Sequence, residues 1–134
     1  MDWITDQIAL GNFLDAARVR PEEVDAILCL RPDCPCEERD DIDVEFVPLK
    51  DGSGNSAADI HEAFEFLRTS VAGGDRVLAH CHAGRSRSVC LVAAWLMADR
   101  AMSQTESLAY IEARRTGGIW LSPGVEEIFG LLKH

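Results

Sequence analysis

A cysteine and an arginine with five residues between them stand in one short polar segment, His80-Cys81-His82-Ala83-Gly84-Arg85-Ser86-Arg87-Ser88. A cysteine acts as a nucleophile in its thiolate form, and an arginine presents a planar fork of donors that matches two oxygens of a phosphate group. Gly84 permits a backbone conformation that is closed to residues with a Cβ, which lets successive N–H groups turn inward and form a nest for an anion. The segment therefore predicts a phosphate-binding loop with Cys81 at its base.

The segments on both sides of this loop must position it. Residues 76–80 are typical of a buried strand, and the apolar run 89–98 after the loop is typical of a buried helix. Because the amino-terminal end of a helix favours an anion, we expect the pKa of Cys81 to lie below the usual range of a cysteine, so that Cys81 acts as a nucleophile. Arg87 opens the helix and is expected to bind phosphate, and Ser88 is placed to donate its hydroxyl to the sulfur.

The rest of the chain alternates short strands with helices. Three further apolar runs predict strands at residues 8–10, 26–30 and 44–48. Capping residues and apolar spacing predict four further helices, at residues 14–19, at 57–72, after Ser103 and from Ser122 onward. We therefore predict an α/β fold with a largely parallel central sheet flanked by helices, with Trp95 and Trp120 in the core.

Length and composition indicate one domain over residues 1–134. The 134 residues are too few for two cores, and 47% hydrophobic and 27% charged residues are typical of a globular protein. The longest apolar run, ten residues, is too short to cross a bilayer, which predicts no integral membrane association. The acidic amino terminus is unlike a signal peptide and predicts a cytoplasmic protein. The net charge of −10 disfavours nucleic acid as a partner.

The cysteine count predicts free thiols rather than a disulfide framework. The chain has five cysteines, an odd number, so at least one is expected to be free. Cys34 and Cys36 stand close to Cys29, but their spacing lacks the paired knuckles of a zinc site. We therefore expect no metal ion.

The loop motif resembles that of the cysteine-dependent protein tyrosine phosphatase superfamily, and its small dual-specificity branch fits best. The resemblance extends over essentially the whole chain: residues 8–12 are similar to the opening strand and turn of that branch, residues 91–97 to the helix after the loop, and Arg114-Arg115 and Ser122-Pro123 to its carboxyl-terminal region. Gly124 stands where the family usually has Asn, so we expect a loop-supporting hydrogen bond to be absent. The resemblance implies a protein tyrosine phosphatase-like fold.

The resemblance also implies a reaction in two steps. The Cys81 thiolate attacks phosphorus to form a phosphocysteine, and water then releases phosphate without a metal or other cofactor. Arg87 and the loop formed by His82, Ala83, Gly84, Arg85 and Ser86 would bind the phosphate oxygens, and Ser88 would stabilise the thiolate. His80 is expected to hydrogen-bond within the base of the loop and to tune Cys81.

A general acid must protonate the leaving oxygen from the same edge of the sheet as Cys81. Asp51 follows the strand that ends near Pro48 and matches the position of the acid in the family, 30 residues before the nucleophile. Asp33 follows the strand that ends at Leu30 and is the alternative. We expect Asp51 to be the acid.

Three functions fit these residues to different degrees. The leading prediction is a phosphatase that acts on phosphotyrosine, and also on phosphoserine and phosphothreonine, in a phosphoprotein or phosphopeptide. His82 and Arg85 resemble basic loop residues of phosphoinositide and phosphatidylglycerophosphate phosphatases, which makes a lipid headgroup the alternative substrate. A non-catalytic phosphate-binding module is a remote third, because Cys81, Arg87 and Asp51 are all present. The oligomeric state and the physiological substrate do not follow from the sequence.

Cys29 is a candidate redox partner of the nucleophile. It stands at the end of a predicted strand whose carboxyl end shares an edge with Cys81, and Cys29-Leu30-Arg31 resembles the placement of a cysteine that pairs with the nucleophile in some members of the superfamily. A low-pKa thiolate is readily oxidised, and a nearby thiol then traps it as a disulfide. Cys34 and Cys36 are competing partners.

Overall fold

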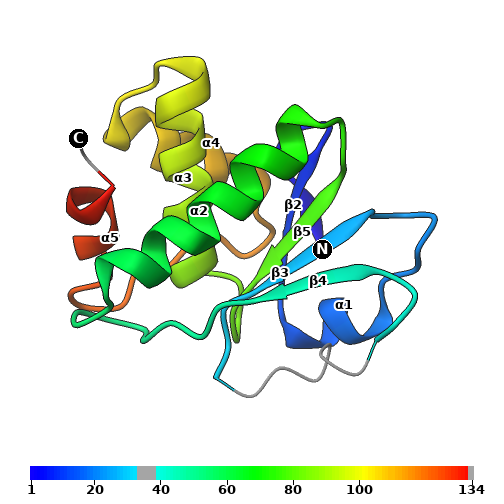
Figure 1. The fold of residues 1–134 in the computed structure, drawn as a ribbon. Coiled ribbons are helices and arrows are strands. Elements are labelled where there is room, and N and C mark those ends of the chain that lie inside the picture. The colour runs from blue at the N-terminus through cyan, green and yellow to red at the C-terminus, as the bar shows by residue number, and fades with distance from the viewer. Residues whose placement is uncertain (33–38, 133–134) are drawn as a thin grey trace.

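A mixed, largely parallel sheet lies at the centre of the protein, as predicted (Figure 1). The computed structural model describes residues 1–32 and 39–132, so Asp33, Cys34 and Cys36 lie outside the described residues. Within those ranges the sheet has five strands in the order β1–β2–β5–β3–β4. The strands are β1 (Asp2–Trp3), β2 (Ile8–Gly11), β3 (Ala26–Cys29), β4 (Asp43–Phe46) and β5 (Val77–His80).

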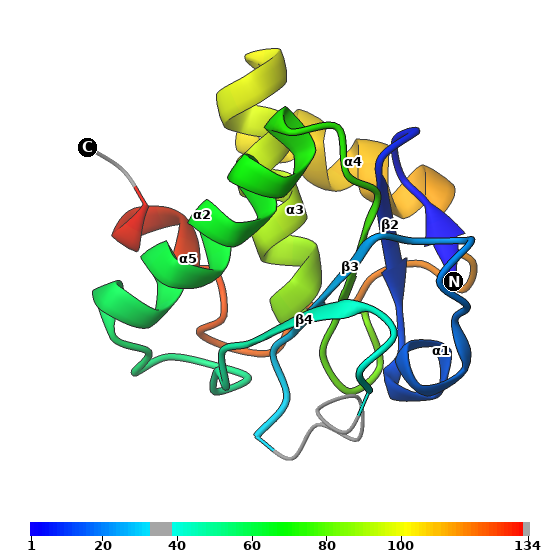
Figure 2. The same ribbon diagram turned by 45° about the vertical axis from the view of Figure 1, so that its right-hand side comes forward.

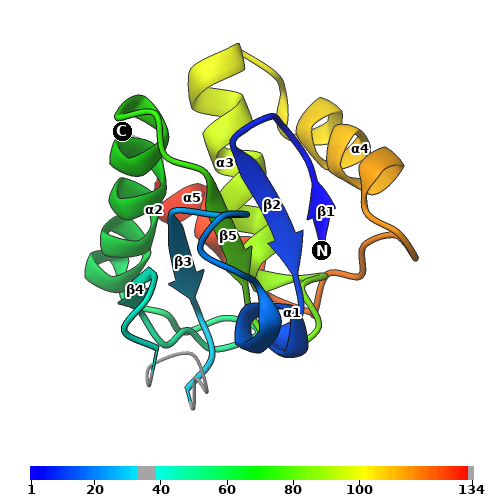
Figure 3. The ribbon, with the colours of Figure 1, turned by 90° about the vertical axis from the view of Figure 1, so that its right-hand side faces the viewer.

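The parallel strands end together at one edge of the sheet. The register pairs His80 of β5 with Gly11 of β2 and with Cys29 of β3, and Cys29 in turn with Phe46 of β4. Among the strands of the described residues, only β1 runs antiparallel, as its arrow beside β2 shows (Figure 3). The chain therefore leaves β2, β3, β4 and β5 at this same edge, where α/β proteins place their ligands.

Helices cover both faces of the sheet. They are α1 (Phe13–Arg18), α2 (Ala57–Ala72), α3 (Arg87–Arg100), α4 (Gln104–Arg114) and α5 (Glu127–Leu131). Side chains at their amino-terminal ends satisfy backbone N–H groups, as predicted for two of them: Ser56 accepts from the N–H of Asp59, and Ser103 forms a reciprocal pair with Glu106. The structure adds a third cap, in which Asn12 pairs in the same way with Asp15.

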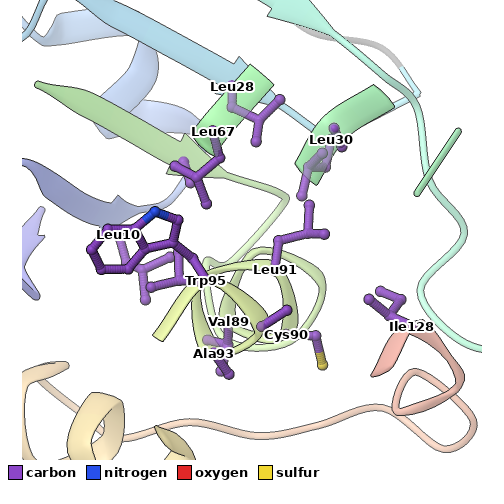
Figure 4. Close-up of a cluster of buried hydrophobic side chains, with 14 of the residues drawn as sticks. Leu10, Leu28, Leu30, Leu67, Val89, Cys90, Leu91, Ala93, Trp95 and Ile128 are labelled. Atoms are coloured by element: carbon purple, nitrogen blue, oxygen red, sulfur yellow. The ribbon is translucent and has the colours of Figure 1, made fainter. Parts of the chain in front are cut away.

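Alternating strand residues divide the core into two clusters. The larger cluster lies between the sheet and helices α2 to α5, where Leu28 and Leu30 face Leu91 of α3 (Figure 4). The smaller cluster lies on the opposite face, where Ile27 and Cys29 pack with residues of and beside α1. Successive side chains of a strand point to opposite faces, so β3 contributes to both clusters.

Helix α3 is the centre of the larger cluster. Its residues 87–96 are all buried, including Trp95, as predicted. The prediction for Trp120 is wrong, because this residue is 67% exposed. Trp120 follows the end of α4 in an irregular segment, so no helical face turns its ring toward the core. None of the helices in the described residues has the length and apolar character needed to span a membrane.

We expect Leu96→Ala in α3 to lower the free energy of unfolding by about 2–5 kcal/mol, because it removes a completely buried side chain and leaves a cavity. Urea unfolding followed by circular dichroism measures this change. Leu14→Ala is the matched control: Leu14 is 44% exposed, and the same substitution there should cost less than ~1 kcal/mol. Equal losses for the two variants would contradict the central place of α3 in the core.

Candidate active site

The loop between β5 and α3, residues 81–86, bends sharply at Gly84. Gly84 has a φ of +70°, a conformation that side chains with a Cβ rarely adopt. A Cβ at this position would overlap the carbonyl oxygen of Gly11 and lie 2.9 Å from Nη2 of Arg115. The position therefore requires glycine for two reasons: its backbone angle, and the close approach of the backbone at Gly11.

Buried Arg115, just after α4, holds the carbonyl groups of this loop. Its Nε donates to the oxygen of Gly84 and its Nη2 to the oxygen of Ala83, both at 3.0 Å. Because C=O and N–H point in opposite directions across a peptide unit, these contacts turn the N–H groups of Gly84 and Arg85 the other way, toward the inside of the loop. The loop therefore presents successive N–H groups in an arrangement that can bind an anion.

Arg115 is itself held by Asp2 of β1. Nη1 of Arg115 lies 2.6 Å from Oδ2 of Asp2, and the backbone N–H and hydroxyl of Thr116 also donate to this carboxylate. Burial opposes the charged form, but these hydrogen bonds hold the pKa of Asp2 below its usual value. Sequence reasoning missed Asp2, because nothing local relates it to a residue more than a hundred positions away.

Cys81 lies at the base of the loop and is only 2% exposed. Its Sγ is 3.3 Å from Oγ of Ser88. Burial raises the pKa of Cys81, but hydrogen bonds from the hydroxyl and N–H of Ser88, the charge of Arg87 and the N–H of Gly84 outweigh burial and lower it below the usual value. These groups therefore favour the thiolate form of Cys81.

The guanidinium of Arg87 has one buried N–H that makes no hydrogen bond. Its guanidinium is anchored by the carbonyl oxygens of Leu49 at 3.0 Å and Leu30 at 3.4 Å, both bound by Nη1. Within the described residues, Nε of Arg87 is the one buried side-chain nitrogen or oxygen without a hydrogen-bond partner. A buried N–H that makes no hydrogen bond, beside a nucleophilic sulfur, can donate to an oxyanion such as a phosphate group.

Asp51, in the loop after β4, lies close to the guanidinium of Arg87. Its Oδ1 lies 3.9 Å from Nε of Arg87, and its Oδ2 accepts a hydrogen bond of 2.6 Å from the hydroxyl of Ser122. The structure thus brings Asp51 to the phosphate loop, where a general acid would be needed. The alternative acid, Asp33, lies outside the described residues.

His80, the last residue of β5, contacts the backbone at the start of the loop. It is completely buried, and its Nδ1 lies 2.9 Å from the carbonyl oxygen of Cys81, which can only accept, so Nδ1 carries the proton. Burial lowers the pKa of His80 to about 4, so the ring is neutral at physiological pH. A neutral His80 orients the backbone of Cys81.

The two basic residues within the loop have different environments. The exposed ring of His82 stacks on Phe13 with centroids 4.9 Å apart, and the guanidinium of Arg31 lies over the same Phe13 ring at 4.7 Å. Arg85 instead turns away and donates to the carbonyl oxygens of Thr116 and Gly118. Of these two basic residues, only His82 has the exposed side chain that the lipid-headgroup hypothesis requires.

The carboxyl-terminal segment supports the loop through Ser122. Figure 2 shows this segment passing the start of α3 on its way to α5. The N–H of Ser122 donates to Oγ of Ser86 at 3.0 Å. We expected Gly124 to remove a loop-supporting hydrogen bond, yet Ser122 makes one from the same segment. Gly124 has a φ of +86°, and a Cβ there would lie 2.9 Å from the backbone nitrogen of Ser53.

Cys29, the candidate redox partner, is not joined to Cys81 in this structure, and a pairing of the two on oxidation stays a prediction. Cys29 is disulfide-bonded, whereas Cys81 and Cys90 are free, so its partner is neither of them. Cys29 belongs to the cluster on the α1 face and Cys81 to the cluster on the opposite face of the sheet. The alternation of side chains along β3 turns Cys29 away from the nucleophile.

Comparison with known proteins agrees with this geometry. Residues 11–133 match the family described as Dual specificity phosphatase, catalytic domain. The chain belongs to this family. It is 29% identical over 113 residues to the dual specificity protein phosphatase Mpk3 of Drosophila melanogaster, across 79% of this chain and 27% of Mpk3.

Solved structures share the fold of this dual-specificity phosphatase domain. The crystal structure of human DUSP28 superimposes with a TM-score of 0.82 and 19% identity, over 97% of this chain and 93% of DUSP28. PTPMT1 in complex with PI(5)P superimposes with a TM-score of 0.73 and 22% identity, over 96% of this chain and 91% of PTPMT1. The match to Mpk3 covers only about a quarter of the length of that protein.

We expect Ser88→Ala to raise the pKa of Cys81, because the variant loses the hydroxyl that donates to the thiolate. The rate at which iodoacetamide alkylates Cys81, followed by peptide mass spectrometry as a function of pH, should then shift to higher pH. Cys90 serves as an internal control, since burial raises its pKa to about 12 and its thiol should react slowly in both proteins. An unshifted alkylation curve would contradict a role for Ser88 in stabilising the thiolate.

Proposed function

We propose that this protein is a phosphatase that hydrolyses phosphate monoesters of tyrosine, and of serine and threonine, in proteins through a phosphocysteine at Cys81. One observation carries the proposal: a thiol of lowered pKa lies in a loop of inward N–H groups beside the buried, unpartnered Nε of Arg87. Membership of the dual-specificity phosphatase family supports it. The cytoplasmic location and the extent of the domain, residues 1–134, stay predictions.

The first step forms the sulfur–phosphorus bond. The Cys81 thiolate attacks phosphorus while the bond to the leaving oxygen breaks, and Asp51 gives that oxygen its proton. Arg87 and the loop amides bind the three equatorial oxygens, where charge is concentrated in the transition state. The buried guanidinium is already anchored to the carbonyl oxygens of Leu49 and Leu30, so little reorganisation is needed.

The second step breaks the sulfur–phosphorus bond. Water attacks phosphorus, the carboxylate of Asp51 takes a proton from it, and the Cys81 thiolate leaves with the Ser88 hydroxyl 3.3 Å from the sulfur. The groups that lower the pKa of Cys81 also make it a good leaving group. The same residues therefore serve both steps.

A phosphoinositide or phosphatidylglycerophosphate headgroup is the second candidate substrate. The exposed His82 within the loop supports it, as does the shared fold with PTPMT1 in complex with PI(5)P. Two observations favour a protein substrate instead: Arg85 is bound to the carbonyl oxygens of Thr116 and Gly118, and the net charge of −10 opposes docking to an anionic bilayer.

Cys81→Ser should abolish turnover but retain binding of a phosphotyrosine peptide, because the hydroxyl is a weak nucleophile while the loop amides and Arg87 remain. Arg87→Lys should lose about 100- to 1000-fold in kcat, since an ammonium cannot replace the fork of donors. Initial rates against phosphotyrosine and phosphothreonine peptides, phosphoinositides and phosphatidylglycerophosphate measure activity and rank the substrates. Cys90→Ser, at a buried thiol outside the site, should keep its activity, and turnover by Cys81→Ser would overturn the mechanism.

Asp51→Asn should lower kcat/KM by about 100-fold for a substrate with a poor leaving group, because the acid that protonates the leaving oxygen is lost. In the wild-type protein kcat/KM for such a substrate should fall as rising pH removes this proton, and in Asp51→Asn this fall should disappear. Asp33→Asn is the matched variant. A flattened profile in Asp33→Asn but not in Asp51→Asn would assign the acid to Asp33.

A further inference from the structure

Ser122 lies between the loop that carries Asp51 and the phosphate loop, and it contacts both. Its hydroxyl donates to Oδ2 of Asp51 at 2.6 Å, and its backbone N–H donates to Oγ of Ser86 at 3.0 Å. Ser122 is 6% exposed and Ser86 5%. One residue therefore connects the carboxylate to the loop that would hold the substrate phosphate.

The backbone around Ser122 is fixed on both sides. Before it, the N–H of Trp120 donates to the carbonyl oxygen of Arg85 at 3.0 Å. After it, the positive φ of Gly124 allows the chain to approach Ser53 closely, and Glu127 accepts a hydrogen bond of 3.1 Å from the N–H of Gly54. The segment thus keeps the Ser122 hydroxyl in place relative to both loops.

The hydrogen bond from Ser122 distinguishes the two oxygens of Asp51. Oδ2 accepts the serine proton, so the acidic proton of a general acid belongs on Oδ1, the oxygen that lies 3.9 Å from Nε of Arg87. That nitrogen marks the expected phosphate position, because it is buried and unpartnered. Oδ1 is therefore the oxygen from which a proton can reach the leaving group.

The hydrogen bond from Ser122 also keeps Asp51 from forming a direct hydrogen bond with Arg87. The unpartnered Nε of Arg87 attracts any nearby carboxylate, and Asp51 is already close to it. If Asp51 moved onto Arg87, its carboxylate would occupy the place of a phosphate oxygen. The short bond to Ser122 holds Asp51 at the distance where it faces the site without filling it.

We propose that Ser122 is a positioning residue that orients Asp51 as the general acid and couples it to the phosphate loop through Ser86. The inference rests on the proposed function, since it assigns a partner to the acid of that reaction. It predicts an effect that depends on the leaving group, because only a poor leaving group needs the proton that Asp51 supplies.

Ser122→Ala tests this role. We expect kcat/KM for phenyl phosphate and a phosphotyrosine peptide to fall by about tenfold or more, the effect of losing a hydrogen bond to a charged group. The value for difluoromethylumbelliferyl phosphate, whose leaving group needs no proton, should change by less than about twofold. Ser122→Thr, which keeps the hydroxyl, should restore the rate, and Ser53→Ala in the Asp51 loop is the matched control that should resemble wild type.

A double-mutant cycle separates orientation of Asp51 from simple support of the loop. In an Asp51→Asn background, Ser122→Ala should cause no further loss with any substrate, because Ser122 acts through the acid. Equal loss with good and poor leaving groups, or additive loss in the double mutant, would overturn the inference and assign Ser122 to the loop alone. Unfolding midpoints check each variant, and Ser122→Cys replaces Ser122→Ala if the latter does not fold.

The same measurements distinguish this inference from the proposed function. If Asp51→Asn shows a leaving-group effect and Ser122→Ala shows none, the inference fails and the phosphatase mechanism stands. If Asp51→Asn shows no leaving-group effect, the assignment of Asp51 as the acid is wrong, and the role of Ser122 that depends on it is wrong as well. Loss of all activity in Cys81→Ser is the reference that establishes the reaction in both cases.

Discussion

The orientation of two peptide units in the phosphate loop is the constraint on which the rest of the site depends. Arg115 binds the carbonyl oxygens of Ala83 and Gly84, and the neighbouring N–H groups must then face the inside of the loop. Gly84 is the residue that permits this bend, because its φ is +70° and the chain at Gly11 leaves no room for a Cβ. Without this arrangement the loop would present carbonyl oxygens to an anion.

The groups around Cys81 create a local positive potential, although the protein as a whole carries a net charge of −10. A net charge of −10 repels a phosphate at long range, so binding of the proposed substrate would depend on groups at short range. The loop amides, the start of α3 and the buried guanidinium of Arg87 supply that positive potential, and they lower the pKa of Cys81 despite its burial. His80 adds no charge, because burial keeps its ring neutral.

Residues distant in sequence converge on the loop through backbone contacts. Arg87 is anchored by carbonyl oxygens that follow β3 and β4, so the sheet edge itself sets the position of the guanidinium. Ser122 reaches the loop from the carboxyl-terminal segment, and Asp2 reaches it through Arg115 from β1. The site is thus assembled from both ends of the chain around one strand–loop–helix unit.

Local spacing in the sequence is enough to predict the loop from Cys81 to Arg87, the glycine within it, and the alternation of strands and helices that places the loop at a sheet edge. The prediction for Trp120 is wrong, and the structure does not join the candidate pair Cys29 and Cys81, because the exposure of one ring and the face of one strand residue depend on packing across the molecule. The hydrogen bond from Ser122 to Asp51 and the one from Arg85 to the carbonyl oxygen of Thr116 become visible only in the tertiary structure. Hydrogen bonds between segments more than thirty residues apart decide these contacts, and such bonds leave no periodic pattern in a single chain.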